Sequence, residues 1–329
     1  MKKVLKIILW LVVIAVIAVA GLLSYIKFAL PNVGPAPEIK VESTLENIER
    51  GKYLANHVTV CIDCHSSRDW SRFSGPPVEG TFGKGGELFD QKYKFPGAFY
   101  SKNITPFNLK NWTDGEIFRA ITTGVDKDGN ALFPVMPFSY YGRMDAEDIK
   151  CIIAYIRTLP EINSNPPVHS PDFPMNFIIN TIPHKEVAQK RPDKNDRVAY
   201  GAYMVNASAC RECHTKVNDK AQLIAGTEFG GGREFPFPDG SVLRSGNISP
   251  DAETGIGSWK EEAFLNLFHS HSDSTTLHTK LKPGDFNSMM PWTMYGKMTD
   301  DDLLAIFAYL KTVPAVKNEV VKYTPGVKF

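Results

Sequence analysis

Two pentapeptides of the form Cys-x-x-Cys-His carry the clearest chemistry in this chain. Their residues are Cys61, Cys64 and His65 in the first copy, and Cys210, Cys213 and His214 in the second. This spacing is the attachment signature of a c-type haem. Two thiols on one helical turn can bind both vinyl groups of a single porphyrin, and the adjoining imidazole then reaches the iron from the same face. The motifs predict two covalently bound haem c groups, with the two histidines as iron ligands.

A single Cys-x-x-Cys could also be half of a zinc site or a redox dithiol. The haem interpretation is favoured because each motif is followed by a Met-Pro pair, at Met136 and Met290. A zinc ribbon or a dithiol does not use a thioether, whereas haem iron accepts one as its sixth ligand. We therefore predict that Met136 and Met290 are axial ligands.

Other methionines near these pairs are less suited to bind iron. Met144 and Met298 lie at the start of a predicted helix, and Met289 lacks the proline that follows Met290. We expect Met289 to be a packing residue.

Composition limits the classes of function. The 329 residues are enough for about two domains. Lys and Arg total 37 against 36 for Asp and Glu, so no global field attracts nucleic acid, and we expect no nucleic-acid partner. The fifth cysteine, Cys151, occupies a helical position where the second half has Ala305, which predicts a small buried residue.

An apolar run near the N-terminus predicts a membrane anchor. Residues 7–26 are almost entirely apolar and would span ~30 Å as a helix, the thickness of one bilayer core. Residues 18–20 also resemble a signal-peptide cleavage site, but the run continues past them. Because Lys2, Lys3 and Lys6 favour a cytoplasmic N-terminus, we predict a single-pass protein of the inner (cytoplasmic) membrane with its haem domains on the periplasmic side.

The chain after the anchor is an internal repeat. Gly51-x-Tyr53 and Gly201-x-Tyr203 precede the two haem motifs, and Asn-Ile-Thr-Pro at residues 103–106 matches Asn-Ile-Ser-Pro at 247–250. The repeated glycines predict a close helix crossing. The implied boundaries are an anchor at 1–29, a linker at 30–45, a first domain at 46–163, a Pro-rich linker at 164–195, a second domain at 196–315 and a tail at 316–329. Periodicity predicts helices with long irregular loops, including glycine-rich turns near each haem.

Taken together, these motifs identify a family. Each half resembles a class I cytochrome c domain and is most similar to those in the cytochrome c subunits of membrane-bound alcohol and gluconate dehydrogenases. The resemblance implies an all-α fold with two tandem cytochrome c domains. Those subunits usually carry three such domains, whereas this chain has two and has no catalytic dehydrogenase domain.

The favoured function is a membrane-anchored dihaem electron carrier. Its redox partners would be a dehydrogenase or quinol-oxidising complex as donor and an acceptor such as a terminal oxidase. A haem subunit of a larger dehydrogenase complex is one alternative. A dihaem cytochrome c peroxidase-like enzyme is another, in which His269, His271 or His278 would displace Met290, although solvated loop histidines are the favoured interpretation. The sequence identifies no catalytic residue and leaves open whether the chain is an enzyme.

Overall fold

The computed structural model describes every residue except 238, 273–278, 283 and 327–329. The longer helices in the described part are α1 (Lys2–Phe28), α2 (Leu45–Tyr53), α5 (Asp114–Thr123), α7 (Ala146–Ile156), α9 (Arg197–Ala207), α11 (Glu261–His269) and α14 (Asp300–Leu310). Single α-helical turns are α3 (Cys61–Cys64), α4 (Pro106–Leu109), α6 (Phe138–Tyr141), α8 (Met175–Ile178), α10 (Cys210–Cys213) and α13 (Trp292–Tyr295). Gln91–Tyr93 and Ile179–Thr181 are 3-10 turns, and Leu54–Val58 is a π-helical turn. Long loops join these elements, as the sequence predicts.

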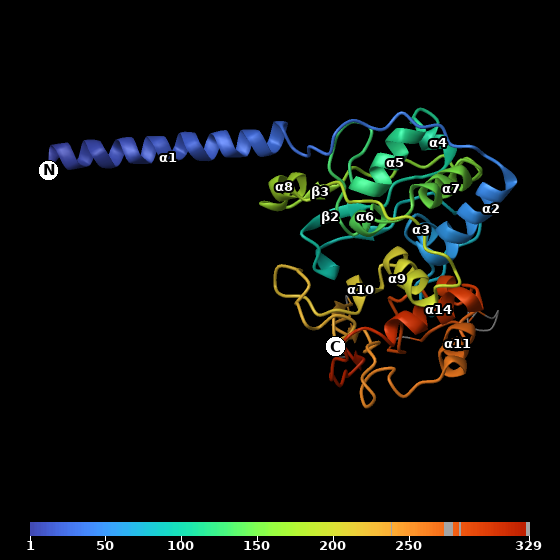
Figure 1. Cartoon of the computed structure of the whole chain (residues 1–329). Coiled ribbons are helices and arrows are strands. Elements are labelled where there is room, and N and C mark those ends of the chain that lie inside the picture. The colour runs from blue at the N-terminus through green and yellow to red at the C-terminus, as the bar shows by residue number, and fades with distance from the viewer. Residues whose placement is uncertain (238, 273–278, 283, 327–329) are drawn as a thin grey trace.

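Helix α1 projects away from the rest of the protein (Figure 1). Within the described residues it is the one helix long and apolar enough to cross a membrane, with a mean hydropathy of 3.0 over its most apolar window. Its C-terminal end lies beside α8, and the Asn180 side chain donates a hydrogen bond to the Ile26 carbonyl at 3.3 Å. The Pro-rich linker therefore packs beside the base of the helix that could anchor the chain.

Each half of the body pairs its first helix with its last, α2 with α7 and α9 with α14. A Cβ on Gly51 would lie 1.8 Å from the Cys151 carbonyl oxygen, and one on Gly201 would lie 1.9 Å from that of Ala305. The predicted close crossing is thus confirmed in both halves. Cys151 is 8% exposed, which confirms a small buried residue at this position.

The π-helical turn Leu54–Val58 compensates for a difference in length between the halves. One more residue separates Gly51 from Cys61 than separates Gly201 from Cys210. A π-helical turn absorbs an inserted residue without ending the helix. The two Cys-x-x-Cys turns consequently start at equivalent points after equivalent helices.

Two small antiparallel sheets accompany the helices, with strand orders β1-β2-β3 and β4-β5-β6. Their strands are β1 (Leu88–Phe89), β2 (Gly97–Tyr100), β3 (Ser170–Pro171), β4 (Glu234–Pro236), β5 (Val242–Arg244) and β6 (Tyr323–Thr324). The third strand of each sheet comes from the segment after the corresponding half of the chain. β3 belongs to the Pro-rich linker, and β6 belongs to the C-terminal tail. The protein is therefore helical with small sheets, and the strictly all-α expectation is not confirmed.

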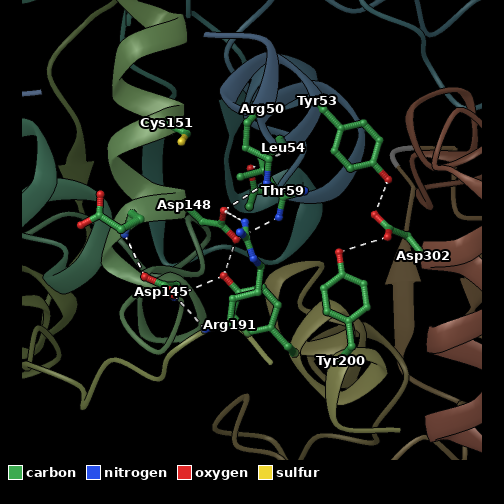
Figure 2. A network of polar contacts seen from close by, with 12 residues as sticks. Arg50, Tyr53, Leu54, Thr59, Asp145, Asp148, Cys151, Arg191, Tyr200 and Asp302 are labelled. Carbon is green, nitrogen blue, oxygen red and sulfur yellow. Dashed lines mark hydrogen bonds and ion pairs between the residues drawn. The ribbon is translucent and has the colours of Figure 1, made fainter. Parts of the chain in front are cut away.

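Reciprocal hydrogen bonds join the two halves. The Tyr53 hydroxyl donates to Asp302 Oδ2 at 2.6 Å, as Figure 2 shows, and the Tyr203 hydroxyl donates to Asp148 Oδ2 at 2.7 Å. Each tyrosine oxygen also accepts a backbone N–H at 3.2 Å, from Thr299 and from Asp145 respectively. Because each half gives a tyrosine to the aspartate of the other, we call this set the tyrosine–aspartate latch.

Asp148 is the more heavily paired carboxylate of the latch. It is 1% exposed and contacts Arg50 at 3.0 Å and Arg191 at 2.7 Å (Figure 2). Burial alone would raise its pKa, but the hydrogen bonds and charge of Arg50, the Tyr203 hydrogen bond and the charge of Arg191 together outweigh burial, so the pKa of Asp148 is lowered. Its contribution to stability is therefore present at neutral pH and is lost as the pH falls through this lowered pKa.

Removing one latch hydroxyl should destabilise the protein. We expect Tyr53→Phe and Tyr203→Phe each to lower the free energy of unfolding by about 1–3 kcal/mol, because each leaves a buried carboxylate short of a donor. Denaturant unfolding of the detergent-solubilised protein measures this. Tyr93→Phe is the matched control, since its hydroxyl has no described partner, and unfolding midpoints equal to this control would contradict the latch.

Candidate haem-binding sites

A strained residue precedes each Cys-x-x-Cys-His motif. Val60 and Ala209 are both in the left-handed region, at φ 47° and φ 48°. Such residues persist only where surrounding contacts hold them. Here the Tyr141 hydroxyl donates to the Thr59 carbonyl at 2.8 Å, and the Tyr295 hydroxyl donates to that of Ser208 at 3.0 Å. Each motif is thereby tied to the tyrosine that follows the Met-Pro pair of its own half.

The two histidines share one hydrogen-bonding geometry. His65 Nδ1 lies 2.6 Å from the Lys102 carbonyl oxygen, and His214 Nδ1 lies 2.8 Å from that of Gly246. A carbonyl can only accept, so Nδ1 carries the proton and Nε2 keeps its lone pair. Burial lowers the pKa of both rings, which keeps them neutral. A neutral imidazole with Nδ1–H bound to a carbonyl is the usual state of a metal-ligating histidine, so both rings fit an iron ligand.

The Asn-Ile-Thr/Ser-Pro motif positions these carbonyls. The Asn103 amide donates to the Ile162 and Ser164 carbonyls at 2.8 and 2.9 Å, and its oxygen accepts the Thr105 N–H at 2.9 Å. Asn247 makes the equivalent bonds, to the Val316 carbonyl at 2.7 Å and from the Ser249 N–H at 2.9 Å. From sequence, this motif is recognisable as part of the repeat but not as a positioning element. Its recurrence directly after Lys102 and Gly246 is the signal for that role.

The glycine-rich loops pack against the same peptide groups. The Gly85 N–H donates to the His65 carbonyl at 2.9 Å, and the Gly231 N–H donates to that of His214 at 2.8 Å. A Cβ on Gly85 would lie 2.5 Å from the Lys102 carbonyl carbon. Only glycine lets the chain approach this closely, and both glycines have positive φ.

The cysteines do not resemble a redox dithiol or a zinc site. No disulfide joins any of the five cysteines, and burial raises the pKa of the Cys64 and Cys210 thiols to about 12. A catalytic dithiol instead has a lowered pKa. Within the described part of the chain, no three His, Cys, Asp or Glu side chains are grouped as metal ligands. The donor set of each motif therefore fits thioether attachment with one histidine ligand.

The four candidate methionines differ in burial. Met144 and Met298 are 1% and 4% exposed and lie in the hydrophobic core. Met136 and Met290 are partly exposed and pack against the same core as Cys61 and Cys210. This burial accords with a structural role for the first pair, and the assignment of the second pair as axial ligands stays a prediction.

The histidines considered for a peroxidase have structural contacts. His269 Nε2 lies 3.0 Å from an Asp300 carboxylate oxygen. The His271 ring lies between aromatic rings, with centroids 4.6 Å from Trp292 and 5.3 Å from Phe73. His269 ends helix α11, so the expectation of a loop residue is wrong for it. His271 lies in the turn that follows and is half-buried, and His278 lies outside the described residues.

No protein-family model matches the chain, but several known proteins are similar to it in sequence. The chain is 29% identical over 288 residues to the fructose dehydrogenase cytochrome subunit of Gluconobacter japonicus, covering 82% of this chain and 53% of that protein. It is 28% identical to the cytochrome c subunit of the quinone alcohol dehydrogenase of Gluconobacter oxydans, covering 82% and 55% respectively. It is 26% identical to a diheme cytochrome c-type protein of Cereibacter sphaeroides, covering 78% and 83%.

The chain spans little more than half the length of the dehydrogenase subunits it matches. The predicted similarity to cytochrome c subunits of alcohol and gluconate dehydrogenases is confirmed.

Loss of Asn103 should release the carbonyl that holds His65. We expect Asn103→Ala to speed hydrogen exchange at His65 Nδ1 by about tenfold or more, because the loop that shields this proton loses the hydrogen bonds of the Asn103 side chain to Ile162, Ser164 and Thr105. NMR of the ring N–H protons in the reduced protein measures this, with His214 as an internal reference. Asn130→Ala, in an exposed turn, is the control. Unchanged exchange at His65 in Asn103→Ala would contradict the positioning role.

Proposed function

We propose that this protein is a membrane-anchored dihaem c-type cytochrome that transfers single electrons. Two tandem cytochrome c domains, residues 46–163 and 196–315, would each hold one covalently attached haem. The observation that carries the proposal is the duplicated geometry of the two motifs. In both halves a Cys-x-x-Cys turn is followed by a neutral histidine whose Nδ1 proton is bound to a backbone carbonyl.

The residues of each site have separate tasks. Cys61 and Cys64 would attach the first haem and Cys210 and Cys213 the second, with His65 and Met136, and His214 and Met290, as the two axial pairs. Haem c supplies a one-electron couple when bound, at a potential that methionine ligation raises. The carbonyls of Lys102 and Gly246 orient the histidines, and the surrounding core excludes water.

The proposed location is based on α1. As an uncleaved anchor it would place the protein in the inner membrane, and the lysines in its first turns would leave both haem domains on the periplasmic side. The donor would be a dehydrogenase or a quinol-oxidising complex, and the acceptor a respiratory component such as a terminal oxidase.

A role as the haem subunit of a larger dehydrogenase complex is the second candidate. It is favoured because several relatives are named as cytochrome subunits of fructose, alcohol or gluconate dehydrogenases. Purification from native membranes separates the two candidates: a dehydrogenase that stays bound through several columns supports the subunit, and the isolated chain supports an independent carrier.

Substitution of single methionines tests the axial ligands. We expect Met136→Ala and Met290→Ala each to abolish the sulfur-to-iron absorption at the red edge of the spectrum for one of two haems. Met289→Ala should leave both bands intact. Met144→Ala should instead lower the free energy of unfolding by about 2–5 kcal/mol, because it opens a cavity in the core. A band lost in Met144→Ala and retained in Met136→Ala would overturn the assignment.

A carrier and a peroxidase differ in their response to external ligands. If both irons keep a methionine ligand, the half-reduced protein should turn over peroxide no faster than free haem controls, because peroxidase chemistry requires an open iron position. Stopped-flow addition of peroxide with an electron donor measures this. Rapid turnover that disappears in His271→Ala would favour the peroxidase instead.

A further inference from the structure

The segment that carries Met290 is held by a serine of the other half. The Ser74 hydroxyl donates to the Met290 carbonyl at 2.6 Å and accepts the Trp292 N–H at 3.0 Å. Ser74 is fully buried. One hydroxyl thus binds the peptide groups on both sides of Pro291, and we call this contact the Ser74 clamp.

The loop that presents Ser74 is itself anchored. Arg68 donates to the Ser74 and Gly75 carbonyls, both at 2.8 Å, and lies 3.2 Å from the carboxylate of Asp63. Asp63 lies between the two cysteines of the first haem motif. A buried polar chain therefore runs from the attachment turn of the N-terminal half to the Met290 segment of the C-terminal half.

Further bonds surround the clamp. The Ser74 N–H donates to the Asn287 side chain at 2.9 Å, and the Leu281 N–H donates to the Ser71 carbonyl at 2.8 Å. Ser74 has a φ of 64°, which a serine adopts only where neighbouring contacts hold it. The clamp therefore belongs to an extended contact between the halves, not to one isolated hydrogen bond.

The clamp breaks the symmetry of the repeat. The Met136 segment has the same backbone turn, with the Phe138 N–H bound to the Met136 carbonyl at 2.8 Å. In the part of the chain that the structure describes, no side chain bonds to either of these two peptide groups. The loop from His65 to Gly85, which carries Ser74, is longer than its counterpart from His214 to Gly231.

We propose that Ser74 is a positioning residue for Met290, which it holds from the other half of the chain. This rests on the proposed role of Met290 as an axial ligand. Because moving Met290 away from its site requires its backbone to move, the clamp opposes loss of this ligand. The C-terminal haem is then the more resistant of the two to external ligands, and the difference originates in the N-terminal half.

Imidazole, which competes with methionine for ferric iron, tests the clamp. We expect Ser74→Ala to increase imidazole affinity at one haem by about tenfold or more, because both hydrogen bonds of the clamp are lost. Ser74→Gly should have the same effect although glycine tolerates the positive φ, so a change in loop strain does not account for it. Ser71→Ala is the matched control, because among the described residues its hydroxyl bonds to Asp69 of the same loop and not to the Met290 segment.

The affected haem is identified with Met290→Ala. The red-edge band that weakens in the Ser74 variants must be the one that Met290→Ala abolishes, and the Met136 band must stay unchanged. Imidazole affinities equal to wild type in both Ser74 variants, with both bands intact, would overturn the clamp. A wild-type protein that carries haem but shows no sulfur-to-iron band would instead overturn the ligand assignment, and with it this inference.

Discussion

Two buried carboxylates, Asp148 and Asp302, hold the parts of this protein in fixed relation. Each lies in the first turn of the last helix of its half and accepts a tyrosine hydroxyl from the other half. Each also has partners in its own half or in the linker: Arg50 and Arg191 for Asp148, and Tyr200 and Lys194 for Asp302. Since a buried charge is stable only when it is fully paired, separating the halves would leave both carboxylates short of donors.

The Cys-x-x-Cys-His motifs are supported by contacts within their own halves that are remote in sequence. The Lys102 carbonyl, 37 residues after His65, orients the His65 ring. The next residue, Asn103, fixes this part of the chain by donating a hydrogen bond to the Ile162 carbonyl near the end of the same half. The C-terminal half repeats these contacts with His214 and Asn247. The two halves therefore repeat each other in hydrogen-bonding geometry as well as in sequence. The Ser74 clamp on Met290 departs from this repeat.

The similarity to cytochrome subunits agrees with the architecture. Two of the relatives described above are subunits of dehydrogenases, and a third is a diheme cytochrome of comparable length. Within the chain, one hydrophobic core cluster includes buried residues from both halves. Such a shared core favours a fixed relation between the two candidate haem sites, which suits electron transfer within one chain.

The sequence by itself determined the features whose signal is local or repeated. The Cys-x-x-Cys-His spacing, the crossing glycines Gly51 and Gly201, the buried Cys151 and the apolar α1 follow from residue type and period alone. Only the tertiary structure decided the Tyr53–Asp302 exchange, the Ser74 clamp and the strands β3 and β6. The physical reason is that these contacts join residues up to about 250 positions apart, and a hydroxyl that will meet a distant carboxylate or carbonyl has the same local pattern as one that faces water.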